Sequence, residues 1–172
     1  HGIRNEDARS NYSYCRMTAN EALIHSFYAT FQKRDAATMK SCYHPEVHFH
    51  DPAFQDLHGA EVGAMWQMLI ERGGDMTLNF SDVKANENEG SATWVAHYTF
   101  SLTGRPVQNH IHAHFRFADG QIIDHRDEFD FDRWLKMAFG WKAWLFKLPP
   151  VRQKFHQRLR TMLNKCITRN FR

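Results

Sequence analysis

The sequence predicts an α+β fold, in which a curved antiparallel sheet is wrapped by N-terminal helices and followed by a C-terminal helical extension. Apolar residues recur at helical spacing in residues 18–34 and 59–72. Four long segments of alternating apolar and polar residues, separated by short turns, then occupy residues 76–129. Helical spacing returns after residue 134. Because the helices precede the strands and do not alternate with them, an antiparallel sheet is favoured over a parallel one.

The first helix has a clear start signal. Thr18 and Glu21 have the spacing of a capping box, so a helix is predicted from Thr18 to about residue 34. Prolines and glycines then mark the ends of three further elements. In order, these are a short helix over 35–43, a short strand over 46–52 and a helix over 59–72.

The next part of the chain is predicted to be a meander of four strands. The four runs are "MTLNFSDVKA", "SATWVAHYTFSL", "VQNHIHAHFRF" and "QIIDHRDEF". In the third run one parity is apolar, while the other carries His110, His112 and His114, so these histidines are expected on the wet outer face. Alternate histidines can bind zinc or nickel, but no carboxylate alternates with them, and no metal site is expected.

The last strand carries the most informative pattern. Ile122, Asp124, Arg126 and Glu128 include three charges and are expected to face water. The opposite parity, Ile123, His125, Asp127 and Phe129, is therefore expected to face the core. A buried carboxylate costs several kcal/mol unless it has a partner. An imidazole two residues away on the same face, roughly 7 Å along the strand, is a suitable partner. The sequence therefore predicts a buried His125–Asp127 pair.

Composition limits the class of protein. The 172 residues are enough for one domain with a substantial core, and 42% hydrophobic with 24% charged residues is typical of a globular domain. No apolar run approaches the roughly 20 residues needed to cross a bilayer. Residues 1–16 are polar and patternless, and are predicted to be a disordered or non-native leader. The three widely spaced cysteines show no disulfide or metal pattern, which favours a cytoplasmic location.

The order of these elements resembles the NTF2-like superfamily, and within it the SnoaL-like polyketide cyclase branch related to ketosteroid isomerases. The resemblance rests on two helices, a short strand ending in Asp51-Pro52, another helix, and a meander ending in "DHRDEFD". It covers residues 17–134 and implies an NTF2-like (cystatin-like) cone, a bent sheet curling round a pocket that helices close. Residues 135–172 are then a basic helical extension. The superfamily contains enzymes and non-catalytic members, so the fold alone does not decide the function.

Only some of the catalytic residues of related enzymes have a match in this sequence. Asp51 matches the general base of ketosteroid isomerases, because Tyr43 precedes it at the same spacing, but the isomerase oxyanion donors fall at Phe27 and Ala113. Without those donors, steroid isomerisation loses its largest stabilising contribution and is not expected. Asp127 matches an aspartate of limonene epoxide hydrolases.

The other epoxide hydrolase positions do not match. Their Arg-x-Asp motif falls at Trp94 and Ala96, which argues against epoxide opening. Polyketide cyclases have a catalytic aspartate in a His-x-Asp setting on the last strand, and His125 with Asp127 fits that pattern best.

These observations predict a cofactor-independent enzyme that moves a proton on a small hydrophobic carbonyl compound, with Asp127, His125 and Asp51 as catalytic residues. The expected pocket lining is Trp66, Trp94, Tyr98, Ala113, Phe115 and Phe129. Each site has a plainer alternative. His125 and Asp127 are also what a polar pair in the core would look like, and Asp51 is suited to satisfying turn amides. The chain as a whole is then a ligand-binding or assembly module without catalysis.

The C-terminal extension has a strong charge imbalance. Residues 133–172 contain 11 basic and no acidic residues, whereas residues 1–132 have a net charge of −8. Pro149-Pro150 is predicted to separate two helices with apolar stripes. The helices either pack on the domain or a twin subunit, or lie on a membrane surface through residues 140–172. Nucleic-acid binding is disfavoured because the body is acidic. A homodimer through the outer face of the sheet is expected from the family resemblance.

Overall fold

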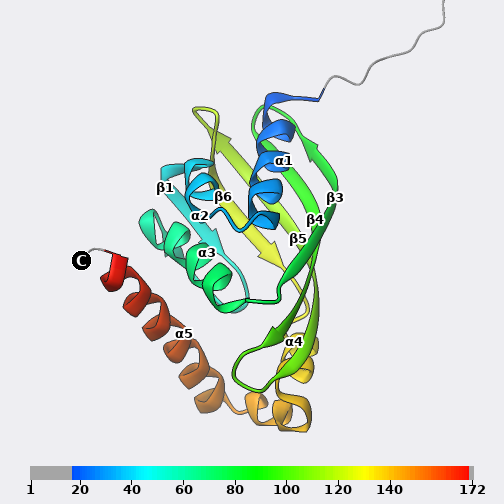
Figure 1. Cartoon of the computed structure of the whole chain (residues 1–172), viewed down its shortest axis with the longest axis vertical. Helices are drawn as coiled ribbons and strands as arrows, with labels where there is room; N and C mark the ends of the chain where they lie inside the picture. Colours follow the sequence, from blue (N-terminus) through cyan, green and yellow to red (C-terminus); the bar gives the residue numbers. More distant parts are fainter. Residues whose placement is uncertain (1–16, 171–172) are drawn as a thin grey trace, which may run out of the picture.

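The computed structural model describes residues 17–170, so the leader predicted over residues 1–16 lies outside the described residues. The chain is an α+β domain with a six-stranded sheet, which confirms the predicted fold class (Figure 1). Its helices are α1 (Ala19–Gln32), α2 (Ala36–Ser41), α3 (Ala60–Arg72), α4 (Phe131–Phe139), the 3₁₀ helix η1 (Gly140–Lys147) and α5 (Pro149–Asn170). Its strands are β1 (Tyr43–His50), β2 (Leu57–His58), β3 (Thr77–Ala85), β4 (Glu89–Phe100), β5 (Arg105–Ala118) and β6 (Gln121–Glu128).

The sheet is mixed, whereas the sequence predicted an antiparallel one. The strand order is β2-β1-β6-β5-β4-β3. The predicted meander from β3 to β6 is present and antiparallel, but β1 lies parallel to β6. The two strands are separated by β2, α3 and the first three strands of the meander, and such a long connection allows parallel pairing. The short strand also begins earlier than expected, at Tyr43, because α2 ends at Ser41.

Helices α1, α2 and α3 lie against one face of the sheet (Figure 1). The predicted capping box is formed at the start of α1 by Thr18 and Glu21. The buried face of α1 consists of Ile24, Phe27, Tyr28 and Phe31. These side chains pack with Trp66 of α3 and Phe115 of β5 in the main core, which places the cavity described below between the helices and the sheet.

The parity of β6 changes at a bulge, which corrects one expectation. Ile122 is fully buried and Ile123 is only partly buried, although the sequence placed Ile122 outward and Ile123 inward. The pairing of β5 with β6 shifts between Arg116 and Phe117, where an extra residue enters the ladder. A bulge of this kind reverses the faces on its two sides. Beyond it, His125 and Asp127 face the core, as the alternation predicted.

The C-terminal extension folds back on the domain. The helix predicted across residues 134–146 is divided into α4 and η1 at Gly140, whose positive φ of 62° favours glycine. The predicted boundary at residue 134 therefore falls inside α4. Helix α5 contacts α3, and its Leu163 and Cys166 are buried in the main core. Among residues 17–170, no helix combines the length and apolar character needed to cross a bilayer.

Candidate active site

A cavity of about 170 Å³ lies between the helices and the inner face of the sheet. Its lining is mostly apolar and comes from α3, β4, β5, β6, α5 and the loop after β1. Besides the tryptophans, the polar residues of this lining that are not exposed are Asp51, Tyr98, Asn109 and Asp127. Arg72, Thr99 and Ser101 also line the cavity but are exposed to solvent. An apolar pocket with a few convergent polar groups is the usual form of a small-molecule site.

Asp127 is held by two side-chain donors. The Nε2 atom of His125 lies 3.0 Å from Oδ1 of Asp127, and the indole Nε1 of Trp94 lies 3.4 Å from the same oxygen. Both His125 and Asp127 are almost fully buried, with 1% and 3% exposed. Among residues 17–170, no hydrogen bond reaches the second oxygen, Oδ2. The carboxylate is therefore anchored through one oxygen, and the other is available to a ligand.

A chain of hydrogen bonds orients His125 from behind. Trp66 Nε1 donates to the hydroxyl of Tyr43 at 2.8 Å, and this hydroxyl lies 2.7 Å from Nδ1 of His125. An indole N–H can only donate, so the Tyr43 oxygen accepts from Trp66; an ionised carboxylate can only accept, so in a neutral imidazole the proton is on Nε2 and Nδ1 accepts the Tyr43 hydroxyl proton. Nε2 then carries the imidazole proton and donates it to Asp127. Burial and the nearby Asp127 raise the pKa of Tyr43 well above its usual value, so this hydroxyl keeps its proton.

Asp51 is the second carboxylate of the cavity, and its environment is different. Its Oδ1 accepts the backbone N–H of Ala53 at 2.7 Å and that of Phe54. Burial raises the pKa of Asp51 to about 7, the charge of Asp127 adds to this effect, and the two backbone hydrogen bonds oppose it. Asp51 therefore exchanges its proton near neutral pH.

Tyr98 is the next polar residue of the lining, and its hydroxyl makes a hydrogen bond whose donor is known. The indole Nε1 of Trp134 donates to this hydroxyl at 2.7 Å. The phenolic oxygen is thus the acceptor, and within residues 17–170 its own proton has no acceptor. Burial raises the pKa of Tyr98 to about 12, and the nearby Asp51 contributes to the rise. The group is a neutral donor that faces the cavity.

The structure separates the predicted site residues into two groups. Asp51 and Asp127 line the same cavity, together with Trp66, Trp94, Tyr98 and Phe129. His125, Phe115 and Ala113 are not part of its lining. Phe115 packs on the His125 ring, with the centroids 4.4 Å apart, and Ala113 is the cross-strand neighbour of Asp127. These three residues form the wall behind Asp127, so direct ligand contact by Phe115 or Ala113 is not supported by this geometry.

Asn109, Leu159 and Met162 are among the contributors to this site that sequence reasoning missed. Asn109 has the inward parity of Val107 and Ile111 on β5, and a polar residue in an apolar parity was a signal that could have revealed it. Leu159 and Met162 of α5 also line the cavity. No periodicity could have assigned them to it, because only the docking of α5 brings them there.

A bent sheet with helices on one face and an apolar cavity between them defines a cone-shaped class of fold. The chain belongs to the SnoaL-like domain family, whose model matches residues 24–125. The match confirms the NTF2-like, SnoaL-type resemblance seen in the sequence. No curated protein matches the chain significantly.

Solved structures agree on the fold. An NTF2-like protein of unknown function from Burkholderia pseudomallei has a TM-score of 0.63 and 16% identity, covering 72% of this chain and 100% of that one. IdmH, a putative polyketide cyclase from Streptomyces antibioticus, has a TM-score of 0.57 and 22% identity, covering 67% and 95%. An LEH-like epoxide hydrolase from M. tuberculosis has a TM-score of 0.58 and 15% identity, covering 78% and 98%. At these identities the similarity shows the fold and not the reaction.

Proposed function

We propose that this protein is an enzyme that moves a proton at a carbon next to the carbonyl of a small, hydrophobic compound. The observation that carries the proposal is the pairing of two unlike carboxyl groups in one apolar cavity. Asp127 is held by two N–H donors, whereas the pKa of Asp51 is raised to about 7. Two carboxyl groups in such different surroundings are suited to separate roles as base and acid.

Asp127 is the general base in this proposal. Its Oδ1 is tied to His125 and Trp94, and Oδ2 takes the proton from the substrate carbon. The hydrogen-bond chain through Tyr43 holds the His125 ring in the tautomer that donates to Asp127. Because these groups are already ordered, little reorganisation accompanies the transfer.

Asp51 and Tyr98 stabilise the enolate that forms. Protonated Asp51 has its Oδ1 on backbone amides and can donate from its other oxygen, while Tyr98 has an unused hydroxyl proton. Removing one donor to a developing oxyanion typically costs about 100- to 1000-fold in rate. The isomerase donors missing at Phe27 and Ala113 are thus replaced by groups from elsewhere in the fold.

The cavity restricts the substrate to a compact apolar molecule. A cavity of similar size, about 150 Å³, holds one benzene molecule in another protein. We infer a substrate whose reacting part is about the size of one ring. Epoxide opening has less support, because Trp94 and Ala96 stand at the positions of the hydrolase Arg-x-Asp motif, and Trp94 donates to Asp127.

The test is hydrogen–deuterium exchange at the α-carbon of small cyclic and aryl ketones in D₂O, followed by NMR. Wild-type protein should accelerate exchange, and Asp127→Asn should lower the rate by about 100- to 10,000-fold, the usual contribution of a general base. His110→Gln, on the exposed outer face, is the matched control and should behave as wild type. Equal exchange by Asp127→Asn would exclude Asp127 as the base. Ketone binding without catalysed exchange in the wild type would instead support the ligand-binding module.

Attachment to a membrane surface is a second proposed function, and η1 favours it. Trp141, Trp144 and Leu148 are exposed by 77%, 54% and 48%, although they are large apolar residues. Lys142 lies over the Trp141 ring, and basic residues predominate throughout this region. Tryptophan and lysine together suit the interface of an anionic bilayer. The apolar side of α5, in contrast, is already occupied by the domain.

Co-sedimentation with phosphatidylserine-containing vesicles tests this second proposal. Wild-type protein should sediment with the vesicles, and a Trp141→Ser/Trp144→Ser variant should remain largely in the supernatant. The His110→Gln variant serves again as the control. Equal sedimentation of the double variant and the wild type would rule out η1 as the membrane contact.

A further inference from the structure

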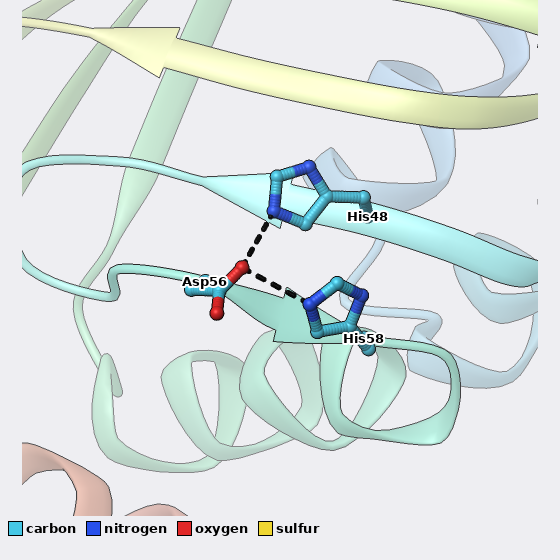
Figure 2. A group of neighbouring side chains, drawn as sticks. All are labelled: His48, Asp56 and His58. Atoms are coloured by element: carbon cyan, nitrogen blue, oxygen red, sulfur yellow. Dashed lines mark hydrogen bonds and ion pairs between the residues drawn. The ribbon is translucent and has the colours of Figure 1, made fainter.

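A second group of histidine and aspartate side chains lies on the outer side of the sheet edge. His48 of β1, His58 of β2 and Asp56 just before β2 turn toward one another (Figure 2). Asp56 Oδ1 lies 3.0 Å from Nε2 of His48 and 3.0 Å from Nε2 of His58. One ligand atom from each residue falls within 4.8 Å of the others.

The backbone brings these residues together for a simple reason. His48 and His58 are direct partners in the antiparallel pairing of β1 and β2, and so are their neighbours Phe49 and Leu57. Phe49 and Leu57 are buried, so strand alternation turns both histidines outward. Their rings stack with centroids 4.7 Å apart. Asp56 has a positive φ of 61° at the start of β2, and its carboxylate reaches both rings.

The hydrogen-bonding capacity of His48 is exceeded by its partners. Its Nδ1 lies 3.2 Å from Oδ2 of Asp124, and its Nε2 faces Asp56. A neutral imidazole has one N–H donor, so one of these two contacts sets a lone pair against a carboxylate. A second ring proton or a cation held by Nε2 resolves this conflict; in the second case Asp124 accepts the Nδ1–H. A carboxylate on the far nitrogen is the usual support of a metal-binding histidine.

We propose that His48, Asp56 and His58 form a binding site for a divalent transition-metal ion, with zinc as the best candidate. Two imidazoles and one carboxylate suit zinc, and the 3.0 Å separations of Asp56 Oδ1 from the two Nε2 atoms are close to those around a tetrahedral ion with bonds of about 2.0–2.1 Å. Asp56 contributes one negative charge at the ion, and Asp124, which also pairs with Arg116 at 3.4 Å, contributes part of a second. The histidines are partly or largely exposed, which leaves room for a water ligand.

The position of the site assigns it a structural role. Asp56 closes the loop that begins at Asp51, and Ala53 and Phe54 of the same loop hold the Asp51 carboxylate by their amides. A metal at Asp56 would tie the outer end of this loop to β1. Metal binding at this site does not depend on the proposed catalytic function, since the ligands lie outside the cavity lining.

Zinc titration of the full chain against a chromophoric chelator tests the site. We expect the wild type to bind zinc tightly at this site, and Asp56→Asn and His58→Gln each to weaken that binding by at least about tenfold. Asparagine tolerates a positive φ well, so Asp56→Asn keeps the backbone of the loop. Asp124→Asn should weaken binding by about 10- to 100-fold through His48. A His112→Gln/His114→Gln variant of the exposed β5 stripe is the matched control and should retain this binding.

Two further readouts make the result decisive. Co²⁺ should shift and broaden the ring resonances of His48 and His58 in NMR spectra, and zinc should raise the melting temperature of wild type but not of Asp56→Asn. Unchanged zinc affinity in both Asp56→Asn and His58→Gln would overturn the proposal. So would the loss of the tight site in the His112→Gln/His114→Gln control, or a wild type that does not compete with the chelator.

Discussion

Two histidine–aspartate pairs in this protein have the same spacing in sequence and the same separation in space, yet opposite surroundings. His125 and Asp127 on β6 lie 3.0 Å apart, with side chains 0% and 3% exposed. Asp56 and His58 at β2 also lie 3.0 Å apart, with side chains 74% and 63% exposed. Strand alternation turns the first pair toward the core and the second toward water. Burial, and not the residue types of the pair, therefore determines which chemistry a histidine–aspartate pair can perform.

Burial gives each member of the inner pair a defined partner and proton. His125 is enclosed by aromatic rings, and its Nδ1 accepts a hydrogen bond from Tyr43. Among the described residues, Asp127 is therefore the acceptor for its Nε2–H. At the outer pair, water competes for every donor, and the proposed zinc ion uses the exposed lone pairs. The same two residue types are therefore suited to proton transfer in one place and to metal binding in the other.

Removing one histidine from each pair tests most directly whether burial explains the difference between them. His125→Leu leaves the buried Asp127 carboxylate with Trp94 as its remaining side-chain donor among the described residues, and we expect unfolding to become easier by about 3 kcal/mol or more. His58→Leu, measured without metal, should leave the unfolding free energy almost unchanged, because exposed ion pairs contribute little. Urea unfolding monitored by circular dichroism provides both values. Similar losses in the two variants would contradict the difference assigned to burial.

The second prediction concerns the pH dependence contributed by Asp51. Its folded pKa, about 7, lies above its usual value of 3.8, so the folded state holds the proton more tightly than the unfolded state. The stability contributed by this proton is complete below about pH 4 and is lost as the pH rises to about 7. Asp51→Asn removes this loss. The variant should gain at most about 4 kcal/mol relative to wild type at pH 9 and little at pH 3.5.

Urea unfolding of both proteins across this pH range measures the effect. A gain that is the same at both ends of the range would mean that the pKa of Asp51 is not raised by folding. Asp130→Asn, at the exposed N-cap of α4, is a suitable control for the loss of a carboxylate elsewhere.

The third and smallest prediction compares two buried tyrosines of the same core. Tyr43→Phe removes the acceptor of Trp66 and the donor of His125, and should cost about 1–3 kcal/mol of stability. The Tyr28 hydroxyl is buried and has no hydrogen-bond partner among the described residues. Tyr28→Phe should therefore be neutral or slightly stabilising. Thermal unfolding at one pH compares them, and equal losses would show that the hydrogen-bond chain behind Asp127 contributes no stability.

Much of the inner site could be predicted from the sequence because it lies within continuous patterns. The charges at Asp124, Arg126 and Glu128 indicated which side of β6 faces water, and so placed His125 and Asp127 inside. Asp51 was found through its Asp-Pro position in the family pattern. The bulge at Ile123 was not predicted, because alternation gives no sign of an extra, unpaired residue within the strand.

The group formed by His48, Asp56 and His58 illustrates the limit of sequence reasoning. His48 lies in the short strand predicted over residues 46–52, but His58 belongs to a two-residue strand, and Asp56 to the loop before it, which are too short for a periodic signal. The same limit applies to α5. Its apolar stripe predicted a packing surface, and nothing in the stripe indicated that Leu159 and Met162 would line the cavity.

The sequence by itself determined the α+β class, the order of helices and strands, and the inward face of His125 and Asp127, because each follows from local periodicity. Only the tertiary structure decided that Asp51 shares a cavity with Asp127, that β1 lies parallel to β6, and that α5 lines the cavity. It also brought His48 to Asp56 and His58. These are contacts between segments far apart in the chain or joined by an irregular loop, and they depend on how the whole sheet and its helices pack.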